Sequence, residues 1–142
     1  MKGFKILTPE FTEIHFQFYW QDAPITCAAF ENILPFTQTF YHARFSGQEI
    51  WIDNLTPLSI LQENASIFTK PGEVVLGPEF PKRTKTANCL GVYYGEGKGI
   101  DACNIFACVV PHHAEMLNNL GMKIWKEGAM ALQFLPLPNL EK

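Results

Sequence analysis

The stretch APITCAAFENILP (residues 23–35), followed by YHARFSG (residues 41–47), predicts a helix joined to a β-strand. Pro24 suits the first turn of a helix, because its missing N–H would have no partner there. Asp22 is placed to cap that turn with its side chain, and Pro35 ends the helix. The apolar residues recur at helical spacing. They form the predicted buried stripe: Ile25, Ala28, Ala29 and Ile33.

The second part of the stretch predicts a β-hairpin. Residues 36–45 are rich in aromatic side chains and threonine, Ser46-Gly47 is a turn signal, and residues 48–52 form the return strand. Side chains two apart on a strand share a face. One face of the first strand is assigned to the core: Tyr41, Ala43 and Phe45.

The opposite face of this hairpin carries the main polar feature of the chain. His42 and Arg44 are two residues apart, and Glu49 and Trp51 share a face of the return strand. Pairing in the hairpin is expected to bring these four side chains together. The alternative is structural, with Arg44 paired to Glu49 or Glu127.

The rest of the chain alternates between strand and loop signals. Further strands are predicted at residues 13–20, 73–76, 89–94, 104–110 and 129–135. Two connections are expected to be exposed and able to act as lids: residues 77–87 and the glycine-rich residues 95–99. Residues 136–138, Pro-Leu-Pro, are expected to break further structure.

A second helix is predicted over residues 111–126, with Leu117, Leu120 and Ile124 as its buried stripe and Gly128 as its cap. The inventory is about eight short strands and two helices in one domain, residues 1–142. A mostly β fold with strands in the majority is most simply packed as a closed or nearly closed barrel with helices at its ends.

Composition excludes several classes of protein. The 47% apolar and 18% charged content argues against disorder, and suggests that a partner or a second copy covers part of the surface, so a homo-oligomer is expected. A formal net charge of −3 with scattered Lys and Arg argues against nucleic-acid binding. The absence of a leader-like or long apolar run predicts a cytoplasmic protein that does not enter a membrane.

No metal site or cofactor is predicted. Cys103 and Cys108 are an odd number of residues apart and would face opposite sides of a strand, and no Cys-x-x-Cys occurs. With Cys27 and Cys89, they are interpreted as small core residues with reduced thiols.

The Pro24-x-Thr26-x-x-x-Phe30 helix, followed by a strand ending near Arg44, resembles the first part of a cyclophilin, where the catalytic arginine lies close to this position. The later Gln-Gly-Gly-Asp and Asn-Gly-Ser-Gln-Phe-Phe segments of cyclophilins are missing. The chain more closely resembles a family of small, uncharacterised bacterial proteins with a cyclophilin-like barrel. The matching pieces include HARFSGQEIW (residues 42–51) and LGMKIWKEGA (residues 120–129). The resemblance implies a fold and no reaction.

These inferences converge on one predicted pocket. Its residues would be His42, Arg44, Glu49, Trp51, Tyr94, Asn104 and Phe106. An arginine offers a planar fork of donors suited to a carboxylate or an amide carbonyl. The leading hypothesis is a protein that binds a small carboxylate, an amide or a short peptide. The alternatives are a peptidyl-prolyl isomerase-like or amide-processing enzyme, and a homo-oligomeric interaction subunit.

Overall fold

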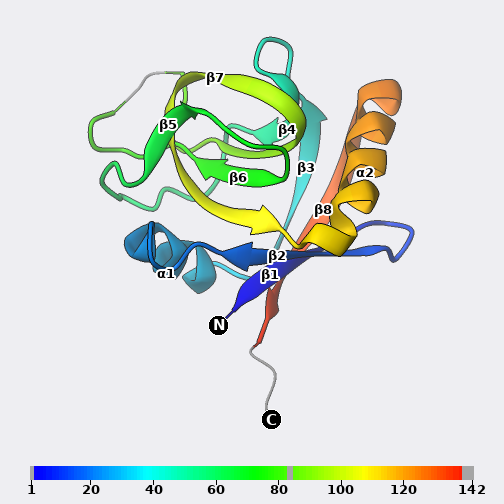
Figure 1. The fold of residues 1–142 in the computed structure, drawn as a ribbon, viewed down its shortest axis with the longest axis horizontal. Coiled ribbons are helices and arrows are strands. Elements are labelled where there is room, and N and C mark those ends of the chain that lie inside the picture. The colour runs from blue at the N-terminus through cyan, green and yellow to red at the C-terminus, as the bar shows by residue number, and fades with distance from the viewer. Residues whose placement is uncertain (1, 83–84, 139–142) are drawn as a thin grey trace.

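The computed structural model describes residues 2–82 and 85–138 (Figure 1). The strands in these residues are β1 (Gly3–Leu7), β2 (Glu13–Phe18), β3 (Phe36–His42), β4 (Gly47–Ile52), β5 (Ala65–Phe68), β6 (Glu73–Leu76), β7 (Leu90–Val109) and β8 (Ala129–Leu137). The helices are α1 (Pro24–Asn32), the 3-10 turn η1 (Pro111–His113) and α2 (Ala114–Glu127). The predicted mostly β class with two α-helices is confirmed.

Six strands close into a barrel. They pair in the order β2-β1-β8-β3-β4-β7, and β7 pairs with β2 to close the ring. Strands β5 and β6 lie outside this ring and pair with β7. The predicted closed barrel is therefore confirmed, although β1 and β5 were not among the expected strands. Residues of β1 pair with β2 on one side and with β8 on the other, so tertiary pairing makes this short segment a strand.

The prediction of two strands joined by a flexible glycine-rich connection is wrong. Strand β7 runs unbroken for 20 residues, and the glycine segment has ladder partners, with Gly97 opposite Gly47 and Lys98 opposite Phe68. The strand curls so far (Figure 1) that Val74 of β6 pairs with both of its halves. At residue 97, glycine allows the turn before β4 to lie close to β7, because a Cβ on Gly97 would lie 2.5 Å from the carbonyl oxygen of Ser46.

The cap of α1 differs from the prediction. Ala23 occupies the N-cap position, and its side chain makes no capping bond. Instead, the carboxylate of Glu63 accepts the backbone N–H groups of Ile25 (3.2 Å) and Thr26 (2.8 Å). An acidic group there satisfies free N–H donors and favours the helix dipole. The cap therefore comes from a residue far along the chain and not from Asp22.

The buried face of α1 is rotated from the predicted stripe. Thr26, Cys27 and Phe30 are fully buried, whereas Ile25 is 58% exposed. The polar side chains can lie inside because each is hydrogen-bonded: Thr26 to Glu63, and the Cys27 thiol to the carbonyl oxygen of Phe106. Which residues of this helix are buried depends more on the hydrogen-bond partners available to them than on their hydrophobicity.

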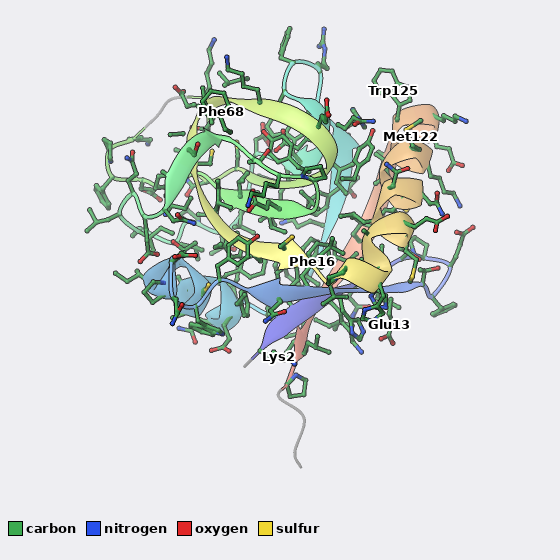
Figure 2. All side chains as sticks on the ribbon, viewed as in Figure 1. Lys2, Glu13, Phe16, Phe68, Met122 and Trp125 are labelled. Atoms are coloured by element: carbon green, nitrogen blue, oxygen red, sulfur yellow. The ribbon has the colours of Figure 1, made fainter. Side chains whose placement is uncertain are left out.

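Phenylalanine rings form much of the barrel core. Phe30 of α1 packs against Phe106 of β7, with ring centroids 4.9 Å apart. Phe4 stacks on Phe16 at the same separation. Figure 2 shows the opposite case at the periphery, where Phe68 and Trp125 stand on β5 and α2 with large exposed fractions. The paired rings in the core stabilise the fold beyond the free energy gained from burial alone.

The hairpin is confirmed, but the assignment of its faces is wrong. Phe40 is fully buried, whereas Tyr41 is 54% and Phe45 is 82% exposed. Strand β3 ends at His42, so Arg44 lies beyond the regular strand and alternation no longer fixes where it points. Of the three residues assigned to the core, only Ala43 is buried.

The second helix follows the prediction closely. Leu117, Leu120 and Ile124 are buried, and Gly121 lies on the same face against the Tyr94 ring. Strand β8 extends to Leu137, which pairs with Gly3, so the expected break at residue 136 is wrong. No helix in residues 2–82 and 85–138 has the length and apolar character needed to span a membrane.

Gly128 ends α2 with φ +104°, and its N–H donates to the carbonyl oxygen of Ile124. A Cβ at this position would have nothing within 4 Å, so the strain of Gly128→Ala is confined to the backbone. We expect Gly128→Ala to lower the free energy of unfolding by about 1 kcal/mol. Urea unfolding followed by circular dichroism measures this, and a change below about 0.3 kcal/mol would contradict the cap's role.

Candidate functional site

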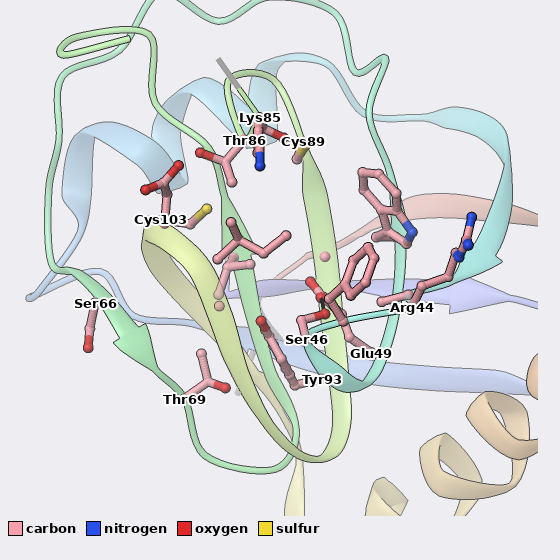
Figure 3. Close-up of a pocket in the computed structure, with 18 residues that line it drawn as sticks. Arg44, Ser46, Glu49, Ser66, Thr69, Lys85, Thr86, Cys89, Tyr93 and Cys103 are labelled. Atoms are coloured by element: carbon pink, nitrogen blue, oxygen red, sulfur yellow. Dashed lines mark hydrogen bonds between the residues drawn. The ribbon is translucent and has the colours of Figure 1, made fainter. Parts of the chain in front are cut away.

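A cavity of about 390 Å³ lies on the outer face of the barrel, where β4 meets β7 (Figure 3). Its lining comes from β4 and the preceding turn, from β5 and β6, from β7, and from the segment before β7. The lining includes the side chains of Arg44, Phe45, Ser46, Glu49, Trp51, Thr69, Lys85, Thr86, Cys89, Tyr93, Ile100, Asp101 and Cys103. Most of the lining is apolar, as is usual for small-molecule sites.

Alternation along two paired strands creates this cavity. Ile50 of β4 and Val92 of β7 point into the barrel core and are fully buried. Their neighbours Glu49 and Tyr93 lie directly opposite each other in the ladder and face outward into the cavity. The outward face is covered by a second, smaller apolar cluster that includes Tyr93 and Cys103, so it is a partly closed site and not open surface.

Glu49 is the most unusual group in the cavity. Its side chain is nearly buried, and the Ser46 hydroxyl donates a hydrogen bond to it. Burial raises the pKa of Glu49 to about 7, while hydrogen bonds from Ser46 and Tyr93 oppose the rise. No Lys, Arg or His of the described residues forms an ion pair with it. A carboxyl with this pKa changes its charge near neutral pH.

Glycine makes room for this carboxyl. A Cβ on Gly91, which faces Trp51 across the ladder, would lie 1.8 Å from Oε2 of Glu49. The position of the Glu49 side chain therefore depends on the absence of a side chain at residue 91.

Two hydroxyls in the cavity have no oxygen or nitrogen partner among the described residues: Oγ1 of Thr69 and Oγ1 of Thr86. Thr86 is 8% exposed, and its polar neighbour is the thiol of Cys103, a weak hydrogen-bonding group. Buried polar groups without partners are uncommon in folded proteins. Both hydroxyl oxygens are buried within the cavity wall.

Burial also raises the pKa of the Cys89 and Cys103 thiols to about 12 and that of Tyr93 above its usual range. All three groups are neutral at physiological pH, and the thiols are poor nucleophiles. Glu49 is therefore the group among these whose ionisation lies closest to neutrality.

Charged side chains lie elsewhere along the cavity wall. Arg44 stands at the outer edge and Lys85 opposite Glu49 (Figure 3). Asp101 also contributes to the lining. The exposed rings and chains of Phe45 and Ile100 border the same space. The site thus combines apolar walls, two cations, the acidic side chain of Asp101 and the separate, nearly buried carboxyl of Glu49.

The seven residues predicted to form one pocket are divided by the structure. Arg44, Glu49 and Trp51 line the main cavity. His42 lines a neighbouring hollow with Arg44, Trp51 and Trp125. The ladder explains the separation, because His42 pairs with Ile50 and lies on the core face, not on the face of Glu49.

His42 and Tyr94 instead form a contact beneath α2. Nδ1 of His42 is 2.8 Å from the carbonyl oxygen of Ala43, and Nε2 is 2.7 Å from the hydroxyl of Tyr94. In the neutral imidazole, Nδ1–H donates to the carbonyl and Nε2 accepts from Tyr94. The structural alternative, in which Arg44 pairs with Glu49 or Glu127, finds no support, since no ion pair of Arg44 occurs in the described part of the chain.

Asn104 and Phe106 lie under α1 and not in the cavity. Asn104 is fully buried, and its amide donates to Thr26 and to the carbonyl oxygen of Leu61. Phe106 packs in the phenylalanine core. The prediction that these two residues line the pocket is therefore wrong, because both hold α1 against the barrel.

Several cavity residues were missed by sequence reasoning, above all Ser46, Tyr93 and Thr86. The predicted pocket contains Tyr94, whereas its neighbour Tyr93, which points to the opposite face of the strand, lines the cavity. The register of β4 against β7 places Tyr93 opposite Glu49, and so decides which of the two tyrosines lines the cavity. Thr86 carries no sequence signal, because it lies in a segment expected to be exposed.

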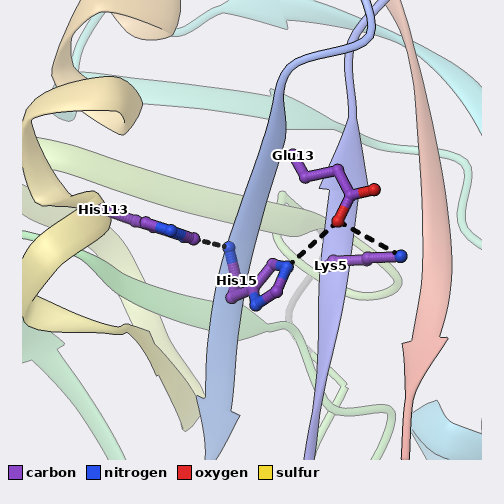
Figure 4. A network of polar contacts seen from close by, with 4 residues as sticks. All are labelled: Lys5, Glu13, His15 and His113. Atoms are coloured by element: carbon purple, nitrogen blue, oxygen red, sulfur yellow. Dashed lines mark hydrogen bonds and ion pairs between the residues drawn. The ribbon is translucent and has the colours of Figure 1, made fainter.

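A second polar cluster lies at the start of α2 (Figure 4). Nδ1 of His113 accepts the backbone N–H of His15 at 2.9 Å, and Glu13 contacts both His15 and Lys5 at 3.2 Å. Burial lowers the pKa of His113, so the neutral form that accepts this bond is favoured. No group of three or more His, Cys, Asp or Glu suited to a metal ion occurs in residues 2–82 and 85–138. The hydrogen bond from the backbone of His15 to His113 joins β2 to the start of α2.

Residues 8–135 match the family model described as a protein of unknown function, DUF3830. The chain belongs to this family. The DUF3830 match begins just after β1 and covers β2 to β7, both helices, most of β8 and all residues that line the cavity. No curated protein matches the chain.

Solved structures show that this DUF3830 chain has a cyclophilin-like fold. A cyclophilin-type peptidyl-prolyl cis-trans isomerase of Cryptosporidium parvum, solved in the presence of the dipeptide Ala-Pro, matches with TM-score 0.57 and 10% identity over 96% of this chain and 99% of the other. A hypothetical protein of Archaeoglobus fulgidus matches with TM-score 0.63 and 15% identity over 96% and 95%.

The McbB protein, solved in complex with tryptophan, matches with TM-score 0.74 and 15% identity. The match covers 98% of this chain and 46% of McbB, so the chain spans about half of McbB's length.

Proposed function

We propose that this protein binds a small carboxylate, an amide or a short peptide in the cavity beside Glu49. The observation that carries the proposal is the cavity itself: about 390 Å³ with apolar walls, lined by a nearly buried carboxyl that has no ion-pair partner among the described residues. Sites for small molecules combine these features, with few polar groups fixing the orientation of an otherwise apolar ligand.

The edge of the cavity suits a ligand carboxylate. Arg44 has no ion pair within residues 2–82 and 85–138, and its guanidinium offers a fork of donors. Trp51, beside it, supplies an aromatic surface. The tryptophan complex of McbB, a protein of similar fold, supports a ligand of this size and type.

We expect a thermal-shift screen of small carboxylates, amides and proline peptides to give hits that depend on Arg44. A ligand at a hundred times its dissociation constant adds about 2.7 kcal/mol of stability. Arg44→Ala should weaken a carboxylate ligand about tenfold, because a charge-assisted hydrogen bond is lost. Lys126→Ala, which removes an exposed cation from α2, is the matched control. Equal affinity of wild type and Arg44→Ala would rule out a carboxylate at Arg44.

An enzymatic alternative is peptidyl-prolyl isomerisation or processing of an amide. The similarity to a prolyl isomerase solved with Ala-Pro favours it, together with Arg44 at the cavity edge, whose guanidinium lies over the Phe45 ring and forms no ion pair among the described residues. A proline-isomerisation assay that gives no rate above the uncatalysed reaction would remove this version.

Self-association is the other alternative. Tyr41, Phe45 and Trp125 are all more than half exposed, although large aromatic side chains are usually buried. Elution as a monomer at micromolar concentration would remove the homo-oligomeric interpretation.

A further inference from the structure

We infer that the ligand of this cavity carries a cationic nitrogen that pairs with Glu49, and a carboxylate that pairs with Arg44, as an apolar amino acid or a short peptide does. This inference rests on the proposed function and narrows it. The proposed function needs an occupant in the cavity, whereas the inference fixes which chemical groups the occupant presents and where.

The first step is that the nearly buried carboxyl of Glu49 has no positively charged partner among the residues that the structure describes. Glu49 is 8% exposed and its carboxyl accepts hydrogen bonds from Ser46 and Tyr93, but no Lys, Arg or His of the described residues forms an ion pair with it. A buried carboxylate is strongly destabilised unless a positive charge or several donors surround it. A ligand ammonium would supply both the charge and additional donors.

The second step concerns the groups that face Glu49. From β7 these are Tyr93 and the Cys103 thiol, from the residue before β7 the Cys89 thiol, and from the turn before β4 Ser46. Tyr93 and the thiols remain neutral near pH 7, because burial raises the pKa of each. The other charged groups in the lining are Arg44, Lys85 and Asp101, and neither cation forms an ion pair with Glu49.

The third step is the separation of charges along the cavity. Glu49 lies at one side, while the cations Arg44 and Lys85 lie at the edge and at the opposite side (Figure 3). Between them the walls are apolar, with Trp51, Tyr93 and Ile100. This pattern matches a molecule with an ammonium, an apolar body and a carboxylate. Phe45, 82% exposed at the border, adds apolar surface for a side chain.

The test uses three probes with the same indole ring: tryptamine, indole-3-propionate and L-tryptophan. They carry an ammonium, a carboxylate, and both groups, respectively. Isothermal titration gives each affinity for wild type, Glu49→Gln, Arg44→Ala and Asp101→Asn. Glutamine keeps the shape and hydrogen bonding of Glu49 without its charge. Asp101→Asn removes a different carboxylate from the same cavity.

We expect Glu49→Gln to weaken tryptamine and L-tryptophan at least tenfold and to leave indole-3-propionate unchanged. Arg44→Ala should weaken indole-3-propionate and L-tryptophan but not tryptamine, and Asp101→Asn should weaken tryptamine and L-tryptophan less than Glu49→Gln does. A circular dichroism spectrum equal to wild type checks that each variant is folded.

Proton release provides a second, independent measurement. Below pH 7, ammonium binding should drive a proton from Glu49, so tryptamine affinity should rise with pH and level off above pH 7. Titrations in two buffers of different ionisation enthalpy detect this proton for wild type, and none should appear for Glu49→Gln.

The outcomes separate the two proposals. Binding of indole-3-propionate together with equal tryptamine affinity in wild type and Glu49→Gln would overturn the inference and leave the proposed function intact. A loss of tryptamine binding in Asp101→Asn alone would also overturn it. If none of the three probes binds wild type, both the inference and the proposed function for ligands of this size are overturned.

Discussion

Asn104→Ala is expected to lower the free energy of unfolding by about 4 kcal/mol, since it leaves several buried groups without hydrogen bonds. The amide of Asn104 donates to Oγ1 of Thr26 at 3.0 Å and to the carbonyl oxygen of Leu61 at 2.9 Å. Its oxygen accepts the backbone N–H of Glu63 at 2.9 Å. Removing the side chain takes a hydrogen bond from all three partners at once.

The loss should extend to α1, because the same network caps this helix. Thr26 donates its hydroxyl to Glu63, and Glu63 accepts the first N–H groups of the helix. We therefore expect reduced helical circular dichroism and faster hydrogen exchange in α1. Urea unfolding gives the free-energy change.

The control is Asn118→Ala, the same substitution on the exposed face of α2. It should change stability by no more than about 0.5 kcal/mol. If Asn104→Ala were as mild as Asn118→Ala, the network would not contribute to holding α1 on the barrel.

Glu49→Gln is expected to change how stability depends on pH. In the unfolded chain Glu49 ionises near its usual value of 4.5, whereas in the folded protein burial raises the pKa to about 7. Between these values the folded state binds more protons than the unfolded state, so the Glu49 contribution to stability falls as pH rises. The fall amounts to about 3 kcal/mol and is complete above pH 7.

Glutamine has no such titration. The stability of Glu49→Gln relative to wild type should therefore increase by about 3 kcal/mol from pH 4 to pH 8. Urea unfolding across this range measures the difference. Glu96→Gln, at an exposed position of β7, is the control and should show no comparable trend. A pH-independent difference for Glu49→Gln would mean that Glu49 is not desolvated in the folded protein.

Local patterns in the sequence predicted a large part of the fold. The hairpin turn at Ser46-Gly47, the buried stripe of α2 and the cap at Gly128 were all predicted. These features depend on residues that are neighbours in the chain, through alternation, helical spacing and glycine conformation. The closed barrel followed from the number of strands and the resemblance.

The candidate site was predicted only in part. Arg44, Glu49 and Trp51 line the cavity, whereas His42, Tyr94, Asn104 and Phe106 have other neighbours. A strand's sequence shows that Tyr93 and Tyr94 point to opposite faces, but not which face meets Glu49. A shift of one residue in register exchanges the two.

The sequence by itself therefore determined the short-range elements and the two polar residues of β4 and the turn that matter most, Glu49 and Arg44. Tertiary structure decided the cap of α1 by Glu63, the unbroken course of β7 and the pairing of Glu49 with Tyr93. These contacts join residues distant in the chain. Their geometry is set by how the whole barrel closes and by which buried polar groups can satisfy one another, and no local pattern records either.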